Sequence, residues 1–380
     1  MICKSISLEN FRNIPHAKVD FCDGINLILG NNAQGKTNLL EAVALMAIGK
    51  SFRGAKDAEM ILFGQSHAKV TLSYHDSLRQ QTASVTMTPG RRRVWEQNEN
   101  KVTKVSDMVG QFRVVIFMPE HLSLIKSGPE LRRNFLDIAL CQLRPVYMHA
   151  LQRYHTILKE RNQLLKQAAE SSTPLSQLLP MLQVWTEPLC KEAAIIASYR
   201  AEFVQKMNRA ALEVFLEMTD GKESPNLIYK GPLGYGEQNQ TPDSYQKILA
   251  KMEESYAREL AAGITLHGCH RDDIEIELNG KSARMFASQG QQRSLSLAMK
   301  LAEGEISKET HGDYPVFLFD DVLSELDRNR KEYLISKIKG KQVILSGCEK
   351  IDLSGQKEDG QSHRIIRVEQ GTFCEKENEA

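Results

Sequence analysis

The chain has 380 residues, with a hydrophobic content of 41%, a charged content of 26% and a formal net charge of +1. This length exceeds that of one typical core, so we expect two domains or one domain with a large insertion. The near-neutral charge excludes a strong overall field that attracts nucleic acid, so any DNA binding must depend on local patches.

Short strands are predicted in the N-terminal part of the chain. Apolar or alternating runs bounded by Asn, Asp and Gly cover residues 2–8, 17–21 and 25–29. From Lys36 onward the apolar spacing changes to i, i+3, i+4, i+7, which predicts an amphipathic helix. Further strands are predicted at 69–74, 81–88 and 92–97, with a turn at Pro89 and Gly90.

The middle of the chain is predicted to be helical. Helix formers at helical spacing fill residues 130–141, 146–167, 175–218 and 244–262, and Gly and Pro interrupt them between 221 and 242. Strand 273–278, helix 291–307 and strands 316–319, 342–345 and 364–368 follow, and the tail after Gly371 is predicted to fray. These elements predict a discontinuous α/β domain from 1–128 and 263–380, with a helical arm inserted at 129–262.

The cysteine content and the N-terminus indicate the cellular compartment of the protein. The seven cysteines are odd in number and contain no C-x-x-C pair, which argues against a disulfide framework and a zinc site. The N-terminus has no basic-then-apolar signal, and no stretch approaches the ~18 apolar residues of a membrane span. We therefore expect a cytoplasmic protein with reduced thiols and no membrane partner.

A glycine-rich loop carries the clearest chemical signal. Residues 30–37 read Gly-Asn-Asn-Ala-Gln-Gly-Lys-Thr and fit the P-loop pattern G-x-x-x-x-G-K-[ST] between a strand and a helix. Glycines let backbone N–H groups approach phosphate oxygens, and the helix N-terminus favours the same anion. Lys36 is expected to bind the β- and γ-phosphates, and Thr37 to ligate Mg²⁺. The predicted nucleotide contacts are Gly30, Asn31, Asn32, Ala33, Gln34, Gly35, Lys36, Thr37 and Asn38.

Two carboxylates follow the apolar run 316–319. The carboxyl ends of strands are where α/β sheets bind ligands, so Asp320 is expected to hold Mg²⁺. Asp321 is a candidate general base that positions the attacking water. A solvated turn at the strand end is the alternative for both. Asp327 is expected either to cap the helix that starts near Arg328 or to act across a subunit boundary.

A second helix start lies at Ser288, within Ser-Gln-Gly-Gln-Gln. Serine is a common N-cap, so the feature has an ordinary explanation. The alternative is a second anion site, where the Ser288 hydroxyl and the N–H groups of Gly290 and Gln291 bind a γ-phosphate. Because one chain already carries a P-loop, this alternative suggests that the phosphate belongs to a partner subunit.

Together these motifs resemble the RecF family of ABC-type, SMC-like ATPases, over essentially the whole chain. The resemblance is carried by residues 8–13, 30–42, 49–53, 118–126, 132–137, 270–273, 288–293 and 320–327. It implies an ABC-type ATPase head with an inserted arm, ATP and Mg²⁺ as cofactors, and a nucleotide contact from Arg12. It also implies an ATP-dependent homodimer, in which the Ser288 segment of one subunit closes on the P-loop of the other until hydrolysis releases it.

The same resemblance implies partners and a role in the cell. DNA at single-strand gaps and duplex junctions would be the substrate, with RecR and RecO as partners in loading RecA. The process would be recombinational repair, the SOS response and replication restart. Asp321 stands where ABC-type ATPases usually carry Glu, so we expect slow hydrolysis. Residues 346–348 lack the switch His of transporter ATPases, so no γ-phosphate sensor is assigned there.

Other readings remain open. Arg91, Arg92 and Arg93 next to Trp95 either contact DNA phosphates or form a solvated hairpin end. The arm residues Arg153, Lys159, Arg161 and Lys166 are expected to form a solvated face by default, and residues 270–273 are either structural or near the nucleotide. A transporter subunit would carry the switch His and no such insertion. A structural SMC- or Rad50-like ATPase needs a far longer coiled coil.

Overall fold

The computed structural model describes residues 1–347 and 362–376, which fall into two compact units. The first unit combines Met1–Ser123 with Ser296–Ala380, and the second is Leu124–Leu295. The inserted part therefore extends beyond the predicted 129–262. The reason is that β11 (Asp273–Leu278) pairs with β9 (Pro225–Gly231), which keeps this stretch with the second unit. Within the described ranges no helix has both the length and the apolarity to cross a membrane.

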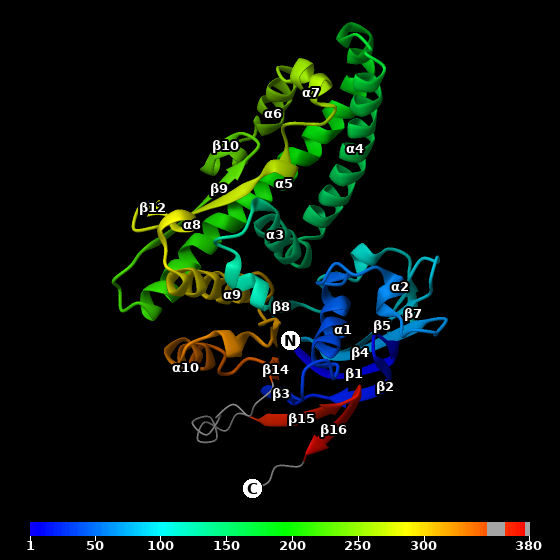
Figure 1. Ribbon diagram of the computed structural model, residues 1–380, viewed down its shortest axis with the longest axis vertical. Coiled ribbons are helices and arrows are strands. Elements are labelled where there is room, and N and C mark those ends of the chain that lie inside the picture. Colours follow the sequence, from blue (N-terminus) through cyan, green and yellow to red (C-terminus); the bar gives the residue numbers. More distant parts are fainter. Residues whose placement is uncertain (348–361, 377–380) are drawn as a thin grey trace. The chain divides into compact units, whose positions relative to one another are not determined.

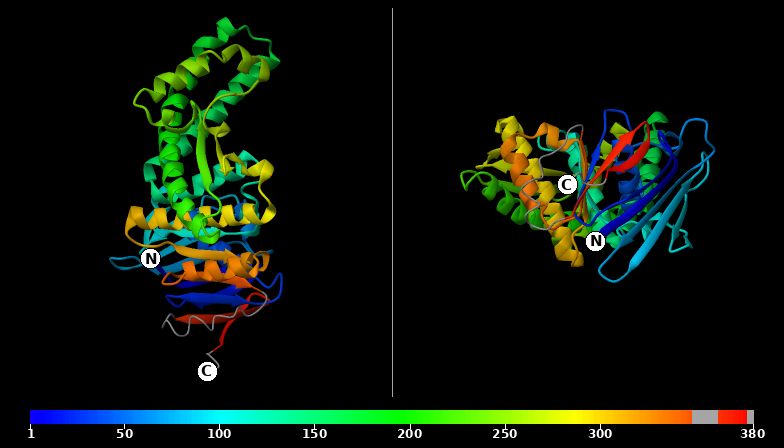
Figure 2. Two further views of the ribbon diagram at one scale, coloured as in Figure 1. Left: turned by 90° about the vertical axis from the view of Figure 1, so that its left-hand side faces the viewer. Right: turned by 90° about the horizontal axis from the view of Figure 1, so that it is seen from below.

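The first unit contains a six-stranded sheet in the order β16-β15-β3-β14-β13-β8. Its strands are β3 (Ile25–Leu29), β8 (Val114–Phe117), β13 (Val316–Asp320), β14 (Val343–Gly347), β15 (His363–Glu369) and β16 (Thr372–Lys376). All neighbours are parallel except the edge strand β16. The left view of Figure 2 shows blue β3 between the orange strands and red β15. Every residue of β3 and of β14 is buried, which is typical of parallel strands covered on both faces.

An antiparallel sheet in the order β2-β1-β4-β5-β6-β7 forms the other half of this unit. Its strands are β1 (Ile2–Phe11), β2 (Ile14–Asp20), β4 (Ala68–His75), β5 (Gln80–Met87), β6 (Val94–Gln97) and β7 (Asn100–Val102). Along β4, buried residues alternate with partly exposed ones, so one face of the sheet packs on the core. The alternation in the sequence correctly predicts most of these strands.

Helix α1 (Lys36–Ile48) lies in the core of the first unit. It packs against β13 and β14 of one sheet and against β1 and β4 of the other. All of its residues are buried except Thr37 and Asn38. The prediction of an amphipathic helix is therefore wrong, because a helix covered by a sheet on two sides is apolar all round. The two partly exposed residues mark where the helix start reaches the surface.

The remaining α-helices of the first unit are α2 (Asp57–Met60), α10 (Arg328–Lys337) and most of α9 (Gln289–His311). The predicted cap at Asp327 is confirmed, since its carboxylate accepts the Arg330 N–H at 3.0 Å. The fraying predicted after Gly371 is wrong for Thr372–Lys376, because β16 pairs with β15. Residues 377–380 lie outside the described part of the chain.

The second unit combines helices with a small sheet. Its helices are α3 (Pro129–Leu143), α4 (Pro145–Glu170), α5 (Leu175–Met218), α6 (Ser244–Glu253), α7 (Tyr256–Ala262) and α8 (Ala283–Phe286). Helices α4 and α5 lie side by side in Figure 1. Strands β10 (Gly234–Tyr235) and β12 (Lys281–Ser282) complete the sheet β10-β9-β11-β12. The arm is thus not wholly helical, because the stretch predicted as a Gly/Pro-rich break supplies β9.

Arg161 is a buried structural residue of the second unit. Its guanidinium donates to Glu259 at 2.6 Å and to the hydroxyls of Thr186 and Thr265, and both charged side chains are fully buried. The expectation that Arg161 belongs to a solvated basic face is therefore wrong. The local spacing of charged residues along a helix could not reveal that Arg161 pairs with a carboxylate almost 100 positions further along the chain.

The segment at residues 270–273 also has a structural role within the second unit. Asp272 accepts hydrogen bonds from Arg200 and Tyr229, and Asp273 pairs with Arg132 at 2.6 Å. Burial raises the pKa of Asp272 to about 6, and the charge of Arg200 opposes this shift. These contacts favour the structural reading of the segment over a position near a nucleotide.

The Arg161 pair gives a stability prediction. We expect Arg161→Ala to lower the free energy of unfolding by about 3–5 kcal/mol, because Glu259 is left as an unpaired buried charge. The matched control is Arg153→Ala, whose pair with Glu192 is half-exposed and contributes at most about 1 kcal/mol. Urea titration compares the two variants, and equal small losses would contradict the assignment.

Candidate functional site

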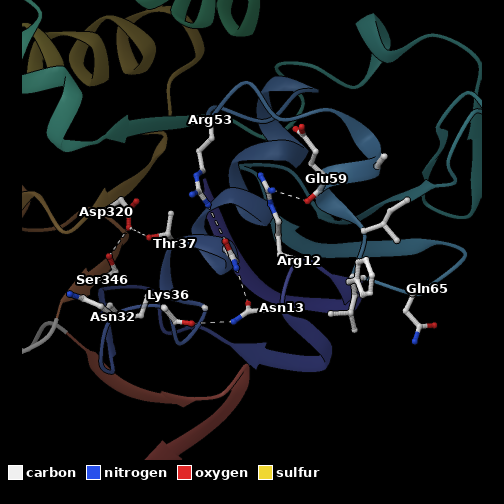
Figure 3. A pocket seen from close by; sticks show the side chains of 18 of the residues that line it. Arg12, Asn13, Asn32, Lys36, Thr37, Arg53, Glu59, Gln65, Asp320 and Ser346 are labelled. Carbon is white, nitrogen blue, oxygen red and sulfur yellow. Dashed lines mark hydrogen bonds between the residues drawn. The ribbon is translucent and has the colours of Figure 1, made fainter.

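A cavity of about 910 Å³ lies where the P-loop, α1 and the ends of β13 and β14 meet in the first unit (Figure 3). The turn between β1 and β2 and the segment that follows α2 complete its wall. Its lining residues are Arg12, Asn13, Asn32, Ala33, Gly35, Lys36, Thr37, Asn38, Arg53, Ala58, Glu59, Ile61, Leu62, Phe63, Gly64, Gln65, Pro89, Asp320, Asp321 and Ser346.

The P-loop backbone has conformations and close contacts that restrict its residues. Gly35 has a φ of 113° and directly precedes α1, and Ala33 has a φ of 63°. A Cβ on Gly30 would lie 2.5 Å from the carbonyl oxygen of Val368. Only glycine fits at position 30 without moving the neighbouring strand, and glycine is the residue that readily adopts the φ of position 35.

Lys36 lies beneath the loop and is 7% exposed. Its ammonium group donates hydrogen bonds to the carbonyl oxygens of Gly30 at 2.5 Å and Asn31 at 3.0 Å. The positive end of the α1 dipole acts at the same place as this cation. The site is therefore electrostatically prepared for an anion with several oxygen atoms.

A polar cluster stands beside the lysine. The Thr37 hydroxyl donates to Asp320 Oδ1 at 2.8 Å, and the Ser346 hydroxyl donates to the same oxygen at 2.9 Å. Burial raises the pKa of Asp320, the charge of Asp321 raises it further, and the two hydroxyl donors lower it. The parallel register sets Asp320 directly beside Ser346 on the next strand.

These oxygen donors fit Mg²⁺, which favours carboxylates and hydroxyls and completes its shell with phosphate oxygens and water. Among the described residues, no group of three or more His, Cys, Asp or Glu side chains could hold a metal by itself. Thr37 and Asp320 would therefore hold the ion together with a bound phosphate, as the sequence predicts.

Asp321 and Ser346 form a linked pair at the strand ends. Asp321 has a φ of 52°, and its N–H donates to the Ser346 hydroxyl at 3.0 Å. Both residues line the cavity. No phosphate sensor is predicted at residues 346–348, and no role is predicted for Ser346; Cys348 lies outside the described residues. The usable signal in the sequence is that Ser346 directly follows the apolar run 342–345, toward the carboxyl end of a predicted strand.

Two arginines bring positive charge to the cavity. Arg12 donates to both carboxylate oxygens of buried Glu41, at 2.9 and 2.7 Å, and to the carbonyl oxygen of Glu59 at 2.7 Å. Arg53 donates to Asn38 Oδ1 at 3.2 Å and is half-exposed. Arg12 thus lines the cavity where the resemblance expected it. Arg53 belongs to segment 49–53, which carries part of the resemblance, but the sequence predicts no role for it.

Other predicted contacts lie elsewhere. Gly30, Asn31 and Gln34 line a second hollow of about 940 Å³, beside β15 and β16. Ser288 is exposed at the start of α9 in the second unit, where its hydroxyl accepts the Gln291 N–H at 3.2 Å. In return, the Gln291 side chain accepts the Ser288 N–H at 2.6 Å. These reciprocal bonds form a capping box, which is the ordinary reading of this serine.

The basic hairpin is only partly available to DNA. Arg93 forms an ion pair with Asp57 at 2.6 Å and donates to the carbonyl oxygen of Gly49. Trp95 is buried in the antiparallel sheet. Arg91 and Arg92 are exposed beside the turn, so any phosphate contact from this hairpin would come from these two residues.

Comparisons with known proteins agree with this geometry. The RecF/RecN/SMC N terminal domain family matches residues 2–354. The DNA replication and repair protein RecF of Acetivibrio thermocellus is 36% identical over 371 residues, which cover 98% of this chain and 99% of that protein.

Solved structures show the same relationship. One described as the recombination mediator protein RecF-ATP in the RecFOR pathway is 32% identical, with a TM-score of 0.88, and covers 99% of this chain and 98% of that one. An SMC head bound to the C-winged helix domain of ScpA is 14% identical, with a TM-score of 0.57, and covers 100% of this chain and 98% of its own; it is alike in fold alone. The predicted fold of an SMC-like ATPase head is confirmed. The chain belongs to the RecF family.

Proposed function

We propose that this chain is an ATP-dependent DNA replication and repair protein of the RecFOR pathway. The observation that carries the proposal is the convergence of Lys36, Thr37, Asp320 and Ser346 at one end of the cavity. The similarity to a RecF protein solved with ATP supports ATP as the nucleotide. The names of the relatives support the role in replication and repair.

Each group in the cavity has a chemical task in this proposal. The backbone N–H groups of the P-loop and the Lys36 ammonium bind the phosphates, and Thr37 and Asp320 hold Mg²⁺. Mg²⁺ supplies charge neutralisation on the β- and γ-phosphates when it is bound. Asp321 positions the water that attacks the γ-phosphate. The side chain of Asp321 is shorter than the Glu that ABC-type ATPases usually carry at this position, which supports slow hydrolysis.

The far end of the cavity fits the nucleoside. Glu59 and Gln65 lie there, and the ring of Phe63 is fully exposed beside Leu62 and Pro89. An exposed aromatic ring next to polar groups offers a base an apolar surface together with hydrogen-bond partners. Arg12 and Arg53 stand between the two ends and would contact the phosphates or the ribose.

The finer part of the proposal concerns assembly. Two copies bind two ATP molecules, and Ser288, Gly290 and Gln291 of one subunit approach the γ-phosphate held by the other. This dimer holds DNA at gaps and duplex junctions, and hydrolysis releases it. The proposed protein partners are RecR and RecO, with RecA loaded as the outcome. Exposed Ser288 at a helix start supports a contact with a second chain.

Replacing Asp321 by asparagine tests the proposed hydrolysis. We expect ATP affinity to stay within about twofold of wild type and turnover to fall by at least about 100-fold, because a positioned base contributes that factor or more. The ATP-bound dimer should then remain on gapped DNA. Steady-state hydrolysis and a gel-shift time course measure both effects.

The control for this variant is Asp23→Asn, which removes an exposed carboxylate paired with Lys4, outside the cavity lining. It should hydrolyse ATP at the wild-type rate. Wild-type turnover in Asp321→Asn would eliminate Asp321 as the group that positions water.

A further inference from the structure

The turn that joins β15 and β16 donates hydrogen bonds to the P-loop. The N–H of Gln370 donates to the side-chain oxygen of Gln34 at 2.5 Å. The N–H of the next residue, Gly371, donates to the backbone oxygen of Gln34 at 3.0 Å. A residue at the centre of the loop is therefore bound through its side chain and its backbone to a turn more than 330 positions away.

This contact fits closely. Gln370 and Gly371 have φ values of 47° and 76°, so both N–H groups of the turn point toward the loop. A Cβ on Gly371 would lie 2.6 Å from the carbonyl oxygen of Asn13, and one on Gly30 would lie 2.5 Å from that of Val368. Gly371 thus lies against the turn between β1 and β2, and Gly30 of the loop lies against β15, in both places with no room for a side chain.

The loop conformation needs this support. Ala33 has a φ of 63°, which an alanine adopts only when its surroundings impose it. Asn13 supports the loop at Ala33 by donating to its carbonyl oxygen at 3.3 Å. Different residues of the loop line two different hollows, of about 910 and 940 Å³. The turn and Asn13 therefore supply hydrogen bonds that hold the loop between two open spaces.

We propose that Gln34, Gln370 and Gly371 are positioning residues, which hold the P-loop in the conformation that binds the triphosphate. This inference rests on the proposed function of the cavity and changes the predicted role of Gln34 from a nucleotide contact to an anchor. The C-terminal hairpin β15–β16 thereby sets the affinity for ATP. A loop released from this contact is in the binding conformation for a smaller fraction of the time, and the apparent Kd equals the intrinsic Kd divided by that fraction, so it rises.

The test removes the acceptor on Gln34 and keeps the length of the side chain, in Gln34→Met. We expect the Kd for Mg-ATP to rise by about fivefold, the effect of one net hydrogen bond. In hydrolysis assays, KM should rise by the same factor while kcat at saturating ATP is unchanged, because the bound nucleotide restores the loop. A general loss of structure would instead lower the melting temperature and the binding stoichiometry.

Gly371→Ala tests the same contact from the hairpin. Its Cβ would collide with Asn13, so the turn must move, and we expect the Kd to rise by more than about tenfold. The control is Thr372→Ala, an exposed residue in the same hairpin, which should bind ATP as wild type does. If one of Gln34→Met and Gly371→Ala unfolds, the Kd of the other variant tests the positioning role.

Wild-type affinity in a folded Gln34→Met or Gly371→Ala protein would overturn the positioning role and leave the proposed function intact. Failure of the wild-type protein to bind Mg-ATP would refute the proposed function itself, so the two failures are distinguishable.

Discussion

Replacing Lys36 by alanine should raise the Kd for Mg-ATP by at least about 100-fold, because the alanine cannot donate the charge-assisted hydrogen bonds that the lysine ammonium gives to the phosphates. The lysine is buried beneath the loop, where its charge is screened less than that of a surface lysine. ATP-dependent dimerisation should disappear with the binding. Isothermal titration calorimetry measures the first effect and sedimentation the second.

The control for this variant is Lys18→Ala, an exposed lysine of β2 outside the cavity lining. It should bind ATP with wild-type affinity, and both variants should melt within a few degrees of wild type. An unchanged Kd in Lys36→Ala would remove the P-loop assignment, and with it the nucleotide-dependent function.

Replacing Ser288 by arginine should leave ATP binding by the single chain within about twofold of wild type and abolish the ATP-dependent dimer. The P-loop lies in the other unit and keeps all its own groups. The arginine removes the hydroxyl that caps α9 and places a bulky side chain where a partner's phosphate must approach. Sedimentation velocity with Mg-ATP measures the loss.

Ser288→Thr is the matched control, because it keeps the hydroxyl acceptor for the Gln291 N–H. It should form the dimer at ATP concentrations close to those of wild type. A normal ATP-dependent dimer in Ser288→Arg would show that this helix start takes no part in a shared site.

Local patterns predict much of the fold and of the site. The strand before the loop, the glycines and the lysine follow from a motif in which each residue has a physical task, and the structure brings that motif together with Asp320. The position of Asp320 at the ligand-binding edge also follows, because α/β sheets bind ligands at the carboxyl ends of their strands.

The remaining features depend on contacts between distant parts of the chain. The pairing of β9 with β11 is set by packing in the second unit, and neither strand carries a local sign of its partner. The burial of Arg161 depends on Glu259, and the helix α1 is covered by two sheets that the apolar spacing alone cannot reveal. The anchoring of Gln34 depends on a turn near the C-terminus.

The most direct test of the shared site mixes Lys36→Ala protein with Ser288→Arg protein and sediments the mixture with Mg-ATP. A mixed pair contains one complete pocket, made from the intact loop of one chain and the intact Ser288 segment of the other. The proposal predicts a species of two chains, near twice 42.9 kDa, that neither variant forms alone. The contrary result is that the mixture sediments as single chains while the wild-type protein dimerises under the same conditions.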